Sequence, residues 1–213
     1  MKKIVLVLIM ILLLTGCTSV QKMSLEEIID KNLNSNLTLS SEHRSGYKYY
    51  LPKGLRITNQ NDYNERIKSG DYTYYFFVDL TSYYNKVIEK FESRDDVYYS
   101  EAIDFKDKYG YLEVKLIKDN KYLIEIMYNY AKIEVIVRKS DINVTVANAI
   151  SILSSIDYND TMVEKIIGEE LSSFSELEYN IFKTTHESNY LELVEKDVYE
   201  EPSDVIHDTD LIK

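Results

Sequence analysis

Three consecutive segments in the middle of the chain have a period of two in their apolar positions. Residues 112–116, 122–130 and 133–138 carry apolar side chains at every second position, which is the periodicity of a strand with one buried face. Asp119 and Asn120 separate the first two segments and tolerate the positive φ of a tight turn. Because the links are short, the pattern predicts an antiparallel meander.

The same period of two predicts further strands at residues 47–51, 55–59, 63–68, 72–80 and 98–105. Pro52-Lys53-Gly54 and Ser69-Gly70-Asp71 are turn sequences between them, and the second predicts a hairpin. Residues 72–78 read Tyr-Thr-Tyr-Tyr-Phe-Phe-Val, apolar or aromatic on both faces. A strand that is covered on both sides explains these two apolar faces, so we expect helices on both faces of the sheet.

Helical spacing appears before and after the strands. Ser24 and Glu27 form a capping box that opens a helix ending at Leu33. A second helix carries an apolar stripe over residues 142–156 and is capped by Ser140 or Asp141, and a third begins near Thr161 with a capping box to Glu164. Residues 82–91 also fit a helical spacing, whereas the polar stretch 34–46 and the charged stretch 92–97 are predicted loops.

The expected fold class is therefore α+β, a mostly antiparallel β-sheet packed by helices. The predicted organisation is a signal peptide at 1–16, a lipidated cysteine, tether and short helix at 17–46, an α+β domain at 47–189 and an acidic tail at 190–213.

The first residues predict the location of the protein. Lys2 and Lys3 precede an uninterrupted apolar stretch that ends at Leu14, which is typical of a secretory signal peptide and too short to span a bilayer comfortably. Leu-Thr-Gly-Cys at residues 14–17 resembles the lipobox of bacterial lipoproteins, in which cleavage falls between Gly16 and Cys17 and the cysteine thiol carries a diacylglycerol. An uncleaved signal anchor is the alternative. The lipobox predicts lipid anchoring, palmitate included, at the extracytoplasmic face of the cell membrane.

Composition narrows the possible partners. The 213 residues carry a net charge of −11, which argues against nucleic acid because that partner requires a basic surface. Removing Lys2 and Lys3 with the leader leaves 23 basic against 36 acidic residues, so anionic headgroups would repel the domain. The membrane contact is therefore expected to be the lipid.

Tyrosine is frequent, with 20 residues. An AT-rich genome explains this, and a tyrosine-lined surface for sugars or peptides is the alternative. For that surface the aromatic strand offers Tyr74, Tyr75 and Tyr83, together with Asp79, the one acid within an apolar segment. An ordinary strand end is the simpler interpretation of Asp79.

No catalytic or metal-binding motif accompanies these features. Cys17 is assigned to the lipid, and the three histidines are scattered and have no Gly-x-Ser-x-Gly elbow or His-Glu-x-x-His motif near them. We therefore expect no enzyme activity, no metal and no cofactor.

Residues 47–55, Tyr-Lys-Tyr-Tyr-Leu-Pro-Lys-Gly-Leu, resemble the opening hairpin of domains with the PsbP/Mog1-like fold. The meander that ends in an Ala/Ile-rich helix at residues 146–150 is also similar, as is the whole chain to uncharacterised lipoproteins of low-GC Gram-positive bacteria. The resemblance implies a sheet between helices and a role in binding or assembly, and it assigns no functional residues.

The function expected from these observations is a non-enzymatic binding or assembly module for a protein or an envelope polymer. Two alternatives stay open. One is a ligand-binding accessory to a membrane transporter, and the other is a cell-envelope hydrolase with paired carboxylates.

Overall fold

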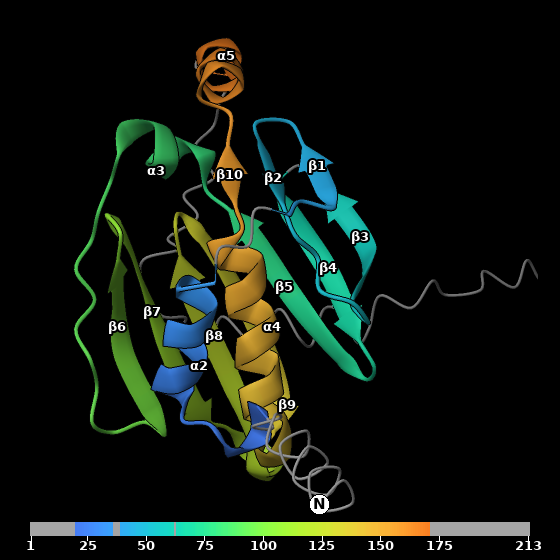
Figure 1. Ribbon diagram of the computed structural model, residues 1–213, viewed down its shortest axis with the longest axis vertical. Helices are drawn as coiled ribbons and strands as arrows, with labels where there is room; N and C mark the ends of the chain where they lie inside the picture. Colours follow the sequence, from blue (N-terminus) through green and yellow to red (C-terminus); the bar gives the residue numbers. More distant parts are fainter. Residues whose placement is uncertain (1–19, 36–38, 62, 171–213) are drawn as a thin grey trace, which may run out of the picture. The chain divides into compact units, whose positions relative to one another are not determined.

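The computed structural model describes residues 20–35, 39–61 and 63–170, and its centre is a seven-stranded antiparallel sheet (Figure 1). The strand order is β3-β4-β5-β9-β8-β7-β6. In chain order the strands are β3 (Arg56–Asn61), β4 (Asn64–Ser69), β5 (Tyr72–Val78), β6 (Tyr99–Phe105), β7 (Lys108–Leu116), β8 (Lys121–Tyr128) and β9 (Ala131–Arg138). The α+β prediction is confirmed.

The predicted meander and hairpin are both present. β7, β8 and β9 pair in sequence, and β4 pairs with β5 from Asn64–Phe77 to Ser69–Tyr72. Asp119 and Asn120 have φ of 59° and 56°, as predicted for that turn. Asn129 and Tyr130 also have positive φ and form a two-residue link, the geometry that matches the twist of paired strands.

A second, three-stranded sheet was not predicted. It contains β1 (Glu42–Arg44), β2 (Tyr47–Tyr49) and β10 (Asp157–Tyr158) in the order β1-β2-β10. The residues on either side of Pro52-Lys53-Gly54 therefore belong to different sheets, because β2 pairs with β1 and β10 while β3 pairs with β4. The polar stretch that was predicted to be a loop contains β1.

Two helices lie against one face of the large sheet (Figure 1). They are α2 (Leu25–Leu33) and α4 (Ile142–Ser154), which also pack on each other. The predicted capping box opens α2: the Glu27 N–H donates to Ser24 Oγ at 3.1 Å, and the Ser24 N–H donates to Glu27 Oε2 at 2.8 Å. The apolar side of α2 is buried in the same core as the strands, so this helix is part of the domain.

The predicted N-terminal caps of the two later helices differ from those in the structure. Asp141 holds the N-cap position of α4, but its side chain makes no cap bond and instead accepts from Tyr72 and pairs with Arg138. α5 (Asp160–Glu170) is capped by Asn159, whose Oδ1 accepts from the Met162 N–H at 3.1 Å. The expected Thr161 box is therefore wrong, because the helix begins one residue earlier than predicted.

The helical spacing over residues 82–91 corresponds to a helix that is shorter and begins two residues earlier. α3 (Leu80–Asn85) ends at Lys86, which adopts φ 53° and ψ 39°, and it packs with α5 at one end of the sheet (Figure 1). A left-handed residue stops a helix, so Val87 and Ile88 are left exposed.

The main core lies between the large sheet and the α2–α4 pair. Ile124 and Ile126 of β8 and Val146, Ala149 and Leu153 of α4 are 0% exposed. Helices were expected on both faces, but within the described ranges α2 and α4 lie on the same one. The other face carries a mixed set of aromatic and charged side chains, and this explains why residues 72–78 look apolar on both sides.

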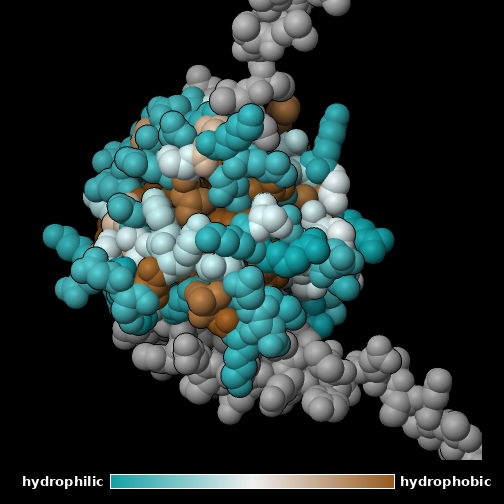
Figure 2. Space-filling view, turned by 90° about the horizontal axis from the view of Figure 1, so that it is seen from below, coloured by the Kyte–Doolittle hydropathy of each residue, from teal (hydrophilic) through white to brown (hydrophobic). Residues whose placement is uncertain are grey.

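At the end of the sheet that lies lowest in Figure 1, the described surface is mostly hydrophilic, with apolar side chains gathered in a central band (Figure 2). The predicted signal peptide, Gly16, Cys17 and the acidic tail lie outside the described residues.

Candidate functional site

The four residues of the predicted aromatic surface do not share one surface. Tyr74 is 1% exposed and lies in the main core, with its hydroxyl 3.5 Å from Asn148 Nδ2 of α4. Tyr75 is the next residue on β5, so it faces the opposite side of the sheet, where the Arg66 guanidinium lies 5.9 Å from its ring. The proposed surface is therefore wrong for Tyr74.

Asp79 and Tyr83 lie beyond the end of β5. Asp79 caps α3 by accepting from the Ser82 N–H and hydroxyl, both at 2.7 Å, which fits its interpretation as a strand end. The Tyr83 ring stacks on Tyr158 at 3.9 Å, and its hydroxyl donates to Asp160 at 2.5 Å. Burial, followed by this bond to Asp160, raises the pKa of Tyr83 to about 12.

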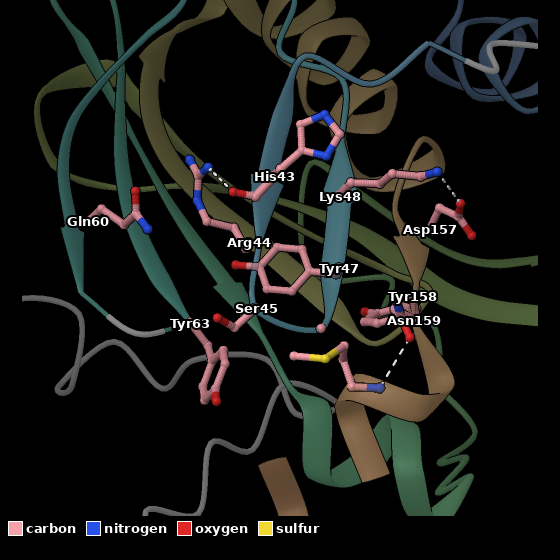
Figure 3. A pocket seen from close by; sticks show the side chains of 12 residues that line it. His43, Arg44, Ser45, Tyr47, Lys48, Gln60, Tyr63, Asp157, Tyr158 and Asn159 are labelled. Carbon is pink, nitrogen blue, oxygen red and sulfur yellow. Dashed lines mark hydrogen bonds and ion pairs between the residues drawn. The ribbon is translucent and has the colours of Figure 1, made fainter. Parts of the chain in front are cut away.

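A pocket of about 910 Å³ lies where the small sheet meets the edge of the large one. Its volume is within the range of about 300 to 1,000 Å³ that is typical of small-molecule sites. Five parts of the chain contribute to it: β1 with the turn after it, β2, β3 with the link to β4, β10, and the start of α5 (Figure 3).

Three tyrosines supply the aromatic part of the pocket. Tyr47, Tyr63 and Tyr158 come from β2, the β3–β4 link and β10. The rings of Tyr47 and Tyr158 lie 6.3 Å apart at 49°, and the Tyr158 hydroxyl donates to the Asn129 carbonyl at 2.7 Å. That bond fixes the Tyr158 ring, so the pocket wall is formed before any ligand arrives.

The Tyr47 hydroxyl is buried without a hydrogen-bond partner within the described residues. Tyr47 is 2% exposed, and Figure 3 shows its hydroxyl directed to the side of the pocket where Ser45 and Tyr63 lie. Burial raises its pKa, and nearby Glu65 adds to this rise, so the hydroxyl keeps its proton. A buried donor without an acceptor is costly, and such groups are rare in native proteins.

The neighbouring residue on the same side of β2 is fully paired. The Tyr49 hydroxyl donates to Glu65 Oε2 at 2.5 Å, and Arg44 reaches both oxygens of that carboxylate, through Nε at 2.8 Å and Nη2 at 3.1 Å. Glu65 is 2% exposed. Arg44 lines the pocket, but its charge is compensated by the buried carboxylate of Glu65.

The remaining charges of the pocket also balance. Lys48 and Asp157 form an ion pair at 3.0 Å across the β2–β10 pairing, and both are exposed. His43, Ser45 and Gln60 add exposed polar groups. The described lining is close to neutral and rich in groups that both donate and accept hydrogen bonds.

Gly46 holds the pocket together at the turn between β1 and β2. Its carbonyl accepts from the Asn159 N–H at 2.9 Å, which joins the small sheet to α5. It has φ +91°, and a Cβ at this position would lie 3.3 Å from side-chain atoms of Leu80, Val163 and Ile166. A side chain here would strain the turn and press on the α3–α5 contact.

A second group of polar residues crosses the face of the large sheet opposite α2 and α4. Glu113, Glu125 and Glu134 stand opposite one another on β7, β8 and β9 and are 0%, 0% and 6% exposed. Lys115 Nζ lies 2.7 Å from Glu113 Oε1 and 2.9 Å from Glu125 Oε2. Lys132 Nζ lies 2.7 Å from Glu134 Oε1 and 4.0 Å from Glu125 Oε1. We call these five residues the charge row.

The charge row brings carboxylates together but binds them to lysines. Burial by itself lowers the pKa of Lys115, yet attraction to Glu125 and bonding to Glu113 outweigh this, so the pKa lies above 10.5. Lys115 therefore stays charged and holds the two carboxylates in ion pairs. Within residues 20–35, 39–61 and 63–170, no cluster of His, Cys, Asp and Glu is suited to hold a metal ion.

Neither group was predicted. The pocket residues come from segments that the hydrophobic pattern does not bring together, so the sequence carries no signal for them. The charge row does have a signal in the sequence, because the two turns of the meander fix the strand register and place the three glutamates side by side. Like charges that face each other destabilise a sheet unless cations intervene.

No helix in the described part of the chain is long and apolar enough to cross a membrane. No family model, curated protein or solved structure matches this chain.

Proposed function

We propose that this chain is a membrane-anchored extracytoplasmic lipoprotein that acts as a non-enzymatic binding module for an envelope polymer. The pocket beside the small sheet is the binding site. The observation that carries the proposal is the buried hydroxyl of Tyr47, which has no partner within the described residues and belongs to a residue that lines a pocket of about 910 Å³. The leader and Cys17 support the location, because the lipobox resemblance calls for a diacylglycerol on that thiol.

The geometry favours binding over hydrolysis. Glycoside hydrolysis uses two carboxyl groups on either side of the bond to be broken. The described residues of the pocket include one carboxylate, Asp157, and it is paired with Lys48. The carboxylates of the charge row are buried and bridged by lysines. An accessory role beside a transporter would use the same pocket with a diffusible ligand.

The location is tested by mass spectrometry of the protein extracted from its host. We expect a mature chain that begins at Cys17 and carries a diacylglycerol, and a Cys17→Ala variant that retains its leader. An unmodified thiol in the native protein would contradict the anchoring.

Binding is tested by sedimentation of the purified lipoprotein with isolated cell walls of the host. Ser45→Trp places a bulky ring at an exposed pocket position, and Ser35→Trp adds the same ring at an exposed position after α2. We expect the wild type and Ser35→Trp to sediment with the walls and Ser45→Trp to remain in the supernatant. Equal sedimentation of the two variants would show that the pocket is not the binding site.

A further inference from the structure

We infer that the pocket binds a neutral saccharide and that the Tyr47 hydroxyl determines its specificity by hydrogen bonding to a sugar oxygen. This inference rests on the proposed function, since it names the ligand class of the same site.

The charge balance of the pocket excludes an anionic ligand as the preferred one. The Arg44 guanidinium already pairs with both oxygens of the buried Glu65, and Lys48 is paired with Asp157 at 3.0 Å. A phosphate or a carboxylate would have to displace one of these partners. Displacing Glu65 would leave a buried carboxylate without its cation, which is strongly destabilising.

The shape of the small sheet disfavours an extended peptide. A peptide that adds a strand to a sheet edge depends on a row of backbone groups along that edge. The edge strands of the small sheet that border the pocket, β1 and β10, are three and two residues long. Among the described residues of β3, the edge strand of the large sheet, only Gln60 near its end lines the pocket. Such edges offer few backbone partners, and this leaves recognition to the side chains.

A sugar ring matches the side chains that are present. Its C–H faces pack on aromatic rings, whose faces carry partial negative charge. Tyr63 and Tyr158 line the pocket, and Tyr158 has one face stacked on Tyr83. The sugar hydroxyls both donate and accept, as do the side chains of Gln60, Ser45 and His43. The volume of about 910 Å³ leaves room for more than one sugar ring, as binding to a polymer requires.

Tyr47 and Tyr49 form a matched pair that separates recognition from folding. Both are buried tyrosines of β2, but the Tyr49 hydroxyl is bonded to Glu65 and the Tyr47 hydroxyl has no partner within the described residues. Tyr47→Phe removes a group that costs free energy in the empty protein, so its melting temperature should stay the same or rise. Tyr49→Phe removes a satisfied bond to a buried carboxylate, so its melting temperature should fall.

The experiment measures competition by soluble probes for wall binding, using the purified lipoprotein. The probes are chitotriose and cellotriose as neutral saccharides, trialanine as a peptide and inorganic phosphate as an anion. We expect a saccharide to displace the protein and the other two to fail. Direct calorimetric titration of that saccharide should show Tyr47→Phe to bind about five- to tenfold more weakly than wild type, with Tyr49→Phe close to wild type at a temperature where both are folded.

Three results would overturn the inference. They are displacement by trialanine or phosphate in place of a saccharide, failure of all four probes, and equal saccharide affinity of Tyr47→Phe and wild type. In each case the wall sedimentation of Ser45→Trp, with Ser35→Trp as its control, still reports separately on the proposed function.

Discussion

The two faces of the seven-stranded sheet are buried in different ways. On β8, Ile124 and Glu125 are neighbours and both are 0% exposed. Ile124 faces the apolar core below α4, and Glu125 stands between two lysines in the charge row. The first face depends on apolar burial, which any residue of similar shape partly supplies. The second depends on charge pairing, where every member requires the others.

The largest expected effect is the loss of the central carboxylate. Glu125→Ala should lower the free energy of unfolding by about 3 to 5 kcal/mol, because it breaks a buried ion pair and leaves cations short of a counter-charge. Urea unfolding of the purified protein, followed by far-UV circular dichroism, measures this loss of stability. A loss below about 1 kcal/mol is typical of exposed pairs and would show that the row contributes little to stability.

The matched control for this prediction is Ile124→Ala. This change should lower the free energy of unfolding by about 2 to 5 kcal/mol, because it leaves a cavity under α4. The two changes differ in their coupling to Lys115→Met. In the Glu125→Ala background, Lys115→Met should lower the free energy of unfolding by less than it does in the wild type, because Lys115 has already lost one of its partners. In the Ile124→Ala background, Lys115→Met should lower the free energy of unfolding by nearly as much as it does in the wild type.

The second prediction concerns alkaline pH. The pKa of Lys115 is raised above 10.5 in the folded protein. The stability that this charge contributes is therefore complete below the pKa of the unfolded chain and is lost as pH rises through the folded value. We expect the free energy of unfolding to fall as pH rises above about 10.4, the pKa of a lysine in the unfolded chain, and part of this fall should disappear in Lys115→Met. Lys121→Met, an exposed lysine of β8, should leave the fall unchanged.

The smallest expected effect is at the start of α2, which helps to cover the apolar face. Ser24→Ala removes the acceptor for the Glu27 N–H and should cost about 1 kcal/mol. Ser24→Asn keeps an acceptor and should remain within a few tenths of a kcal/mol of wild type. If the two variants unfold at the same urea concentration, the cap contributes nothing to the stability of the domain.

Much of the fold could be predicted because it depends on local patterns. Alternating residues, positive-φ turn residues and the Ser24 box each determine an element within a few residues of themselves. The small sheet could not be predicted in this way. Its strands are three, three and two residues long, too short for a period to appear, and its pairing joins distant parts of the chain.

The candidate site was harder to predict, because it too depends on contacts between distant parts of the chain. A pattern of alternating residues shows which side chains share a face, and it does not show whether that face is buried. Glu113 and Glu134 therefore looked like solvent-facing residues, whereas they are buried beside lysines. Tyr47 looked like any aromatic strand residue, because the absence of a partner for its hydroxyl is a property of the assembled fold.

The pairing of β2 with β10 has a consequence for the order of folding. Next to this pairing, the Tyr50 N–H donates to the Ser155 hydroxyl, across 105 positions of the chain. Closing so long a loop costs entropy that the meander and its hairpins do not incur. The last wall of the pocket is thus expected to form late, so the pocket would stay incomplete until folding is finished. A ligand that binds the folded pocket would stabilise that late contact by mass action.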